Sequence, residues 1–297
     1  MKSRWLLNLA IALAIGALIL VAVLKPGSKP APENPPLTTL TPDAIHHVRI
    51  ARPGQPELVL DKQGDHWRLT APRTARANDF RVDALARLTT APVTVRFPAV
   101  PSELGKFGLD PAQATVFLND TEIRFGAMHP LQNEVYVLHG DQVQLVPAGA
   151  LRTALTPPDD WLSPALLEDK LKLLSLRLPG FSLKQNAQGA WVRSPELRDL
   201  ASDTVNQFVD EWRLARALSV IAWGGQPFKD RVTITVADDD KSRTIEFGIL
   251  ARKPELVLVR LDEKLEYHFP EESGTRLLEL APEKDTPPAT APTPPVK

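Results

Sequence analysis

Residues 66–72 read HWRLTAP, and residues 190–196 read AWVRSPE. Each copy follows a polar, turn-like stretch, which is DKQGD before the first and KQNAQG before the second. The tryptophans of the two copies, Trp67 and Trp191, lie 124 positions apart (191 minus 67). A pattern that returns at such a distance indicates an internal duplication, and a duplication constrains the whole fold.

The elements around the first copy alternate in a recognisable order. Residues 45–52 predict a strand, 57–72 predict strand–turn–strand, 93–97 a further strand, 114–126 and 134–147 two hairpins, and 148–155 a short helix. Between them, residues 78–88 predict a helix that Asn78 or Asp79 caps. Its expected apolar face consists of Phe80, Val82, Leu85, Ala86 and Leu88.

The second half of the chain repeats this order. Strands are expected at 171–178 and 218–223, strand–turn–strand at 181–195, hairpins at 231–248 and 255–270, and a last helix at 271–280. Residues 202–218 predict an amphipathic helix capped by Ser202 or Asp203, with an apolar stripe of Val205, Phe208, Val209 and Trp212. We therefore predict an α+β fold of two tandem similar units, each a mainly antiparallel sheet packed on one principal helix.

The repeat divides the chain into six segments. They are a transmembrane anchor (1–25), a Pro-rich spacer (26–44), a first α+β repeat (45–155), a linker (156–170), a second α+β repeat (171–280) and a disordered Pro/Thr/Ala-rich tail (281–297). The linker is polar and Pro-rich at first and is then expected to turn helical. It is expected to wedge between the two units, with Trp161 capping a core there.

Residues 5–24 contain no charged side chain. As a helix, this run would span about 30 Å, which is the thickness of a bilayer hydrocarbon core. The alternative is a cleaved signal peptide, whose apolar region is usually shorter. Lys2 and Arg4 favour a cytoplasmic N-terminus. In a bacterium, the chain would be a single-pass inner-membrane protein with its bulk in the periplasm.

The composition limits the partners and the kinds of site that the chain can have. The chain has 297 residues, a net charge of −1 and no cysteine. The neutral balance argues against a nucleic-acid partner. Without cysteine there is no disulfide, no thiolate metal site and no cysteine nucleophile.

No motif in the chain indicates catalysis. His46 and His47 are adjacent on a strand and therefore point to opposite faces, which does not suit a shared metal ion. Nucleotide-binding, nucleophile-elbow and zinc-protease patterns do not occur in the sequence. We therefore expect no catalytic residue, no metal site and no cofactor. The residues that stand out are four structural or cleft aromatics, of which the first three are expected to be buried: Trp67, Trp191, Trp212 and Trp223.

Four stretches together resemble a known family. They are MKSRWLLNLA (1–10), RIARPGQPELVLDKQGDHWRLTAP (49–72), KFGLDPAQATVFLNDTEIRFG (106–126) and PLQNEVYVLHGDQVQLV (130–146). They look like the bacterial domain-of-unknown-function 4340 family. The resemblance implies an inner-membrane protein that faces the periplasm, encoded near ABC transporters of the gliding-motility auxiliary type. It transfers no catalytic residue.

Three functions fit these observations. The first is a membrane-anchored, non-catalytic periplasmic interaction module that is an accessory of an ABC-type transporter, with transporter subunits as protein partners. The second is a periplasmic binder of a glycan or small solute that uses aromatic platforms. The third is an envelope hydrolase with a site between the repeats, which predicts His, Asp or Glu side chains facing that cleft.

Overall fold

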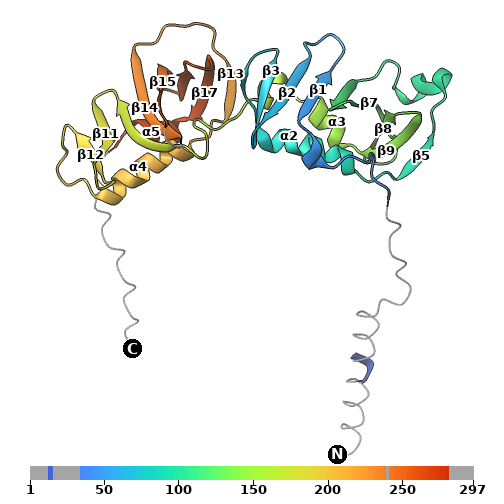
Figure 1. The fold of residues 1–297 in the computed structure, drawn as a ribbon, viewed down its shortest axis with the longest axis horizontal. Coiled ribbons are helices and arrows are strands. Elements are labelled where there is room, and N and C mark those ends of the chain that lie inside the picture. Colours follow the sequence, from blue (N-terminus) through green and yellow to red (C-terminus); the bar gives the residue numbers. More distant parts are fainter. Residues whose placement is uncertain (1–12, 16–33, 239–240, 281–297) are drawn as a thin grey trace, which may run out of the picture.

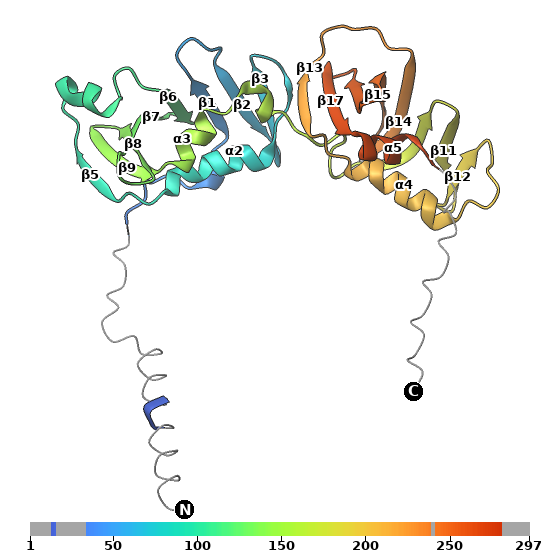
Figure 2. The same cartoon turned by 180° about the vertical axis from the view of Figure 1, so that it is seen from behind.

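The computed structural model describes residues 13–15, 34–238 and 241–280 of the chain. These residues form two antiparallel sheets that lie side by side, with helices packed against one face of each (Figures 1 and 2). The predicted α+β fold with antiparallel sheets is confirmed. We call residues 34–155 the first half, residues 156–170 the linker and residues 171–280 the second half.

In the described residues the first sheet has nine strands and the second has eight. The first contains β1 (His47–Ala51), β2 (Leu58–Gln63), β3 (His66–Ala71), β4 (Ala75–Arg76), β5 (Val95–Pro98), β6 (Ala114–Leu118), β7 (Thr121–Met128), β8 (Glu134–His139) and β9 (Gln142–Pro147). The second contains β10 (Lys172–Leu178), β11 (Phe181–Gln185), β12 (Trp191–Ser194), β13 (Ser219–Ala222), β14 (Asp230–Asp238), β15 (Lys241–Ala251), β16 (Glu255–Arg260) and β17 (Leu265–Pro270). The α-helices are α2 (Asp79–Ala86), α3 (Gly149–Ala154), α4 (Ser202–Leu214) and α5 (Glu271–Leu278).

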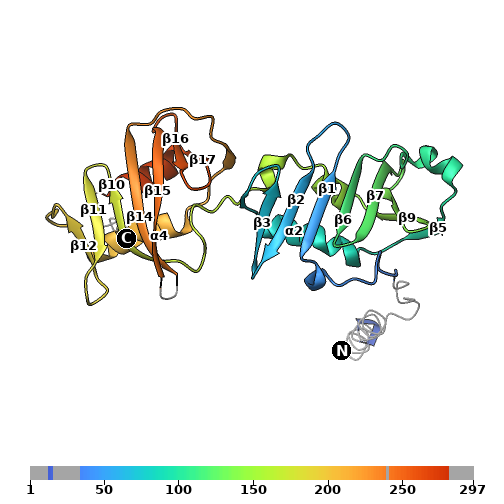
Figure 3. The same cartoon turned by 45° about the horizontal axis from the view of Figure 1, so that its top comes forward.

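The two sheets share one strand order. The first runs β4-β3-β2-β1-β6-β7-β8-β9-β5, and the second runs β12-β11-β10-β14-β15-β16-β17-β13 (Figure 3). Apart from the two-residue β4, every strand of the first sheet has a counterpart at the same place in the second. The repeat in the sequence thus corresponds to a repeat in topology.

A pair of glycines marks the same point in both sheets. Gly126 on β7 and Gly248 on β15 lie close to a shift in strand register. A Cβ on Gly126 would lie 2.2 Å from the carbonyl oxygen of Phe107, and a Cβ on Gly248 would lie 2.6 Å from the ring of Phe228. Each glycine is required because another segment crosses its strand at close range.

A buried tryptophan anchors the principal helix of each half. Trp67 on β3 is 2% exposed and donates its indole N–H to Asp83 of α2, 3.0 Å away. Trp212 on α4 is fully buried and donates its indole N–H to the carbonyl oxygen of Leu277 in α5, 2.8 Å away. The prediction that these two residues lie in the core is confirmed.

Two predictions about helix faces and ends are wrong. Phe80 is 78% exposed, because it lies two residues, or about 200° of helix rotation, from the buried Val82. Neither Ser202 nor Asp203 caps α4, since the helix begins at Ser202 itself and Ala201 occupies the cap position without a side-chain hydrogen bond. The predicted cap of α2 is confirmed, because the Asn78 side chain accepts a hydrogen bond from the Arg81 N–H.

The linker departs from expectation as well. It contains one 3₁₀ turn (Pro158–Trp161), and residues 162–170 are not helical. The reason is that its backbone hydrogen bonds go to the two halves, as described below, and not along a helix. Trp161 is fully buried, in agreement with its predicted place in a core.

The packed part of the chain begins within the predicted spacer. Leu37 is 2% exposed, and the N–H groups of Leu37 and Thr38 donate to Ala91 and Thr89. The first half therefore starts ahead of residue 45. The predicted anchor at 5–24, apart from the helical residues 13–15, and the tail at 281–297 lie outside the described residues. Within the described ranges, no helix is long and apolar enough to cross a membrane.

Candidate functional site

The linker joins the two halves through backbone hydrogen bonds on both of its sides. On one side, the Ser163 N–H donates to the carbonyl oxygen of Arg76, next to β3, at 2.9 Å. On the other side, the Leu166 N–H donates to the carbonyl oxygen of Ala215, ahead of β13, at 2.9 Å. Residues 162–166 thus bridge both halves, with isolated antiparallel pairings of Leu162 with Ala77 and of Ala165 with Arg216, and we call this region the junction.

A buried ion pair crosses the junction. Arg76 of the first half donates from Nε and Nη2 to the two carboxylate oxygens of Glu263 in the second half, at 2.7 and 3.2 Å. Its Nη2 also donates to the hydroxyl of Tyr267 at 2.8 Å, and that hydroxyl donates to Glu263 at 2.9 Å. The side chains of Arg76 and Glu263 are 10% and 8% exposed, so the three groups form a closed ring shielded from water.

A second arginine extends this ring. Arg260 is 1% exposed and donates to both carboxylate oxygens of Asp262, at 2.9 and 3.1 Å. It also donates to Glu168 of the linker at 3.1 Å and to the carbonyl oxygen of Leu166 at 3.0 Å. Arg243 supplies a further hydrogen bond to Glu168 at 2.8 Å. We call Arg76, Glu168, Arg260, Glu263 and Tyr267 the junction network.

The arginines determine the charge state of this network. Burial by itself raises the pKa of Glu168, but the charges of Arg260 and Arg76 and the hydrogen bonds from Arg243 and Arg260 outweigh it and lower the pKa to about 2. The pKa of Glu263 is also lowered, because Arg76 outweighs the effect of burial. Burial raises the pKa of Tyr267. At neutral pH both carboxylates are therefore ionised and the phenol keeps its proton.

The network fixes the orientation of the halves more than it adds stability. The desolvation cost of burying an ion pair offsets much of the attraction between its two charges. Removing one partner nevertheless leaves the other charge uncompensated, which destabilises the fold by about 3–5 kcal/mol. Since Arg76 belongs to one half and Glu263 to the other, any rotation of the halves would incur that cost. The junction therefore favours one arrangement.

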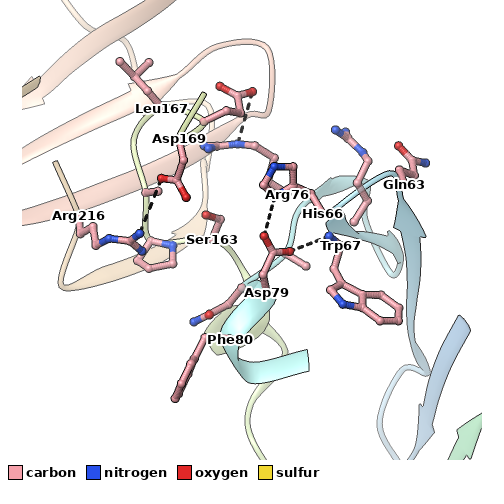
Figure 4. Close-up of a pocket in the computed structure, with 16 residues that line it drawn as sticks. Gln63, His66, Trp67, Arg76, Asp79, Phe80, Ser163, Leu167, Asp169 and Arg216 are labelled. Carbon is pink, nitrogen blue, oxygen red and sulfur yellow. Dashed lines mark hydrogen bonds and ion pairs between the residues drawn. The ribbon is translucent and has the colours of Figure 1, made fainter. Parts of the chain in front are cut away.

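A pocket of about 440 Å³ lies at the junction, with walls from both halves and the linker (Figure 4). Gln63, His66 and Trp67 lie on one side of it and Arg216 on the other. The Nδ1 atom of His66 lies 2.8 Å from one carboxylate oxygen of Asp79, whose other oxygen accepts the Trp67 backbone N–H at 2.6 Å. Histidine and carboxylate side chains line the pocket, as the hydrolase alternative predicts.

A histidine held by a carboxylate is also part of hydrolase triads, where its second nitrogen takes a proton from a hydroxyl. Ser163 lines the same pocket. Among the described residues, however, no serine or threonine hydroxyl makes a hydrogen bond to His66. The pocket brings together titratable groups without a nucleophile–base contact. In the described part of the chain, no group of three or more His, Asp or Glu side chains is placed to hold a metal ion.

The four predicted aromatics do not form a common site. Trp67 lines the pocket, whereas Trp212 lies inside the core of the second half. Trp191 is half-buried, contrary to expectation, because β12 is a four-residue strand at the edge of its sheet. Trp223 is half-buried too and donates its indole N–H to Gln226 at 3.2 Å.

The junction network was missed at the level of sequence, although one signal for it existed. On β16, Leu256 and Leu258 point into the core, and Arg260 continues the same alternation. A charged residue in phase with core positions has to be paired. Its partner Asp262 and the neighbouring Glu263 lie in the following turn, where acidic residues are common and do not by themselves indicate a buried site.

Comparison with known proteins gives one match. A family model described as "Domain of unknown function (DUF4340)" matches residues 67–227, which are 161 of the 297 residues. The matched region begins at Trp67, contains Arg76, the whole linker and α4, and ends after β13. No curated protein matches the chain, and no solved structure matches it either. The resemblance noted in the sequence is confirmed.

Proposed function

Because the chain belongs to the family described as a domain of unknown function (DUF4340), whose description states no activity, we propose its function from its own architecture. The protein is a membrane-anchored periplasmic interaction module that acts by binding and not by catalysis. It serves as an accessory component of an ABC-type transporter system. The tether rests on the uncharged run at residues 5–24, and the transporter rests on the family resemblance.

One observation carries the proposal, and it is the junction network. A module that only connects partners needs surfaces held in a fixed relation to each other. The buried contact between Arg76 and Glu263 ties the two similar halves into one body. A partner can then bind across both halves without first ordering them, which lowers the entropic cost of association.

Exposed apolar side chains beside the junction support a partner site there. Phe80 of the first half is 78% exposed, and Leu214 and Leu218 of the second half are 67% and 80% exposed. Phe80 lines the junction pocket, and Leu214 and Leu218 lie two residues before and two residues after Arg216 of the same pocket in the sequence. Exposed apolar side chains that form one contiguous patch mark protein-binding surfaces, and we propose that these three residues belong to such a surface.

Photo-crosslinking in cells tests the partner. A photo-reactive amino acid is placed at Phe80 or Leu218 in the full-length protein, and at the exposed Asp120 and Gln188 as controls away from the junction. The expected result is an adduct with a transporter permease from the junction positions only. Adducts that are equally strong from the control positions, or none with any transporter subunit, would contradict the proposal.

The tether has its own test. Removal of residues 1–25 should leave a folded, soluble protein that no longer supports its complex. Full function of that truncated form in cells would show that membrane attachment is not needed.

A further inference from the structure

The junction pocket has a charge composition that a scaffold does not need. Its volume of about 440 Å³ falls within the range of small-molecule sites. It opens between the two halves, so that a molecule in it would contact residues of both (Figure 4). The chemistry of such a molecule follows from which wall charges are already neutralised.

The acidic groups of the wall are mostly occupied. Asp79 accepts from the Trp67 N–H and faces His66 with its other oxygen. Glu168 accepts hydrogen bonds from Arg260 and Arg243. Asp169 is the remaining carboxylate, and it is 72% exposed at the rim, 3.9 Å from Arg216. Both inner carboxylates are thus already engaged by hydrogen-bond partners of the protein.

The cations of the wall are less well satisfied. Arg68 on β3 stands directly opposite Arg76 on β4, so that the two guanidinium-bearing residues share one face of the sheet. Glu263 neutralises Arg76, but within the described residues Arg68 makes no side-chain hydrogen bond and no ion pair. In the described part of the chain, the Arg216 side chain makes one ion pair, a long contact with Asp169, and it is 61% exposed.

Uncharged donors complete the wall. The side chains of Gln63 and Ser163 make no hydrogen bond in the described part of the protein, and neither does the amide nitrogen of Asn78. Arginine and amide donors without partners are the groups that recognise carboxylate and phosphate oxygens. The donor groups of the pocket that have no partner within the protein are therefore suited to bind an anion.

We infer that the junction pocket binds a small organic anion through a carboxylate or phosphate group, with Arg68 of the first half and Arg216 of the second half as the recognition residues. This binding is independent of the proposed scaffold function. Since the ligand contacts both halves, it stabilises the folded junction and raises its resistance to unfolding by mass action.

The test uses full-length protein in mild detergent, with inorganic phosphate and citrate as separate probes. Binding is measured by calorimetry and by the shift of the melting temperature. The variants are Arg68→Gln and Arg216→Gln, and Arg177→Gln is the matched control because it removes the same charge from an exposed site on β10 that lines no part of this pocket. Circular dichroism confirms that each variant is folded.

The expected result is saturable binding of at least one probe, weakened about tenfold or more by either pocket variant and unchanged by the control. A preference for phosphate over citrate, or the reverse, identifies the anionic group. Absence of binding by both probes up to about 10 mM, a regime weaker than a functional solute site, would overturn the inference. Equal binding by all variants would overturn it as well.

Discussion

Replacing Arg76 by methionine should loosen the junction without harming either core. The change removes two hydrogen bonds to Glu263, one to Tyr267 and one to the carbonyl oxygen of Leu166. Glu263 then remains 8% exposed, with Arg260 at 3.8 Å and the Tyr267 hydroxyl as its nearest polar groups. Leaving a buried charge without any partner costs about 3–5 kcal/mol, so the loss should fall near the lower end of this range, because Arg260 still faces Glu263.

The matched control is Arg124→Met. Arg124 also contacts a glutamate, Glu122, at 2.7 Å, but the two side chains are 43% and 40% exposed. An ion pair that water reaches contributes about 0–1 kcal/mol. The same substitution should therefore be several times less harmful at this site, although the contact distance is equal.

The assay is urea unfolding combined with hydrogen exchange of the amides of Ser163 and Leu166. These two N–H groups bond the linker to the first and second half, so they report the junction directly. A triple variant, Arg76→Met with Glu263→Leu and Tyr267→Phe, should regain most of the loss, because no buried polar group is left unpaired. If Arg76→Met and Arg124→Met cost the same, the junction network does not hold the halves together.

Three further outcomes follow from particular residues. Because the pKa of Glu168 falls from 4.5 to about 2 on folding, its contribution to the free energy of unfolding is complete above pH 4.5 and is lost as the pH falls toward 2. The contribution amounts to about 3 kcal/mol. Acid unfolding of Glu168→Gln should therefore lack this pH-dependent loss of stability. Gly126→Ala should cost about 1–3 kcal/mol or more by overpacking, measured by urea unfolding. Gly149→Ala in α3 is the control and should be neutral or stabilising, because the nearest atom would lie 3.8 Å from the new Cβ. Equal effects of the two substitutions would contradict the close crossing at Gly126. Trp67→Ala should cost about 3–5 kcal/mol, and Trp191→Ala on the edge strand should cost less than half of that, with thermal unfolding as the check.

The repeat could be predicted from the sequence because the patterns that define each copy are local. Strand alternation, hairpin turns and two tryptophans at matching places depend on neighbouring residues, and the shared strand order agrees with them. Phe80 was misplaced because it has the character of a core residue but lies on the outer side of a short helix, where only the angle from Val82 decides its exposure. Trp191 was misplaced because nothing local shows that β12 is an edge strand.

The candidate site could not be found in this way, because its residues meet only in three dimensions. Arg76 and Glu263 are 187 positions apart, and each stands in a stretch typical of a surface turn or strand end. The linker was expected to be helical from its composition, yet its backbone bonds to both halves. Pairings of this kind depend on how the two sheets pack against each other, and the hydrophobic periodicity of a single strand or helix gives no information about that.

Whether the two halves form one rigid body can be measured directly in this chain. The sequence contains no cysteine, so two introduced cysteines can carry the only spin labels. Labels at Asp120→Cys in the first half and Gln188→Cys in the second lie on exposed turns. Pulsed dipolar spectroscopy should give one narrow distance distribution, which broadens when Arg76 is replaced by methionine. A broad or multiple distribution in the otherwise unaltered protein would contradict the central claim.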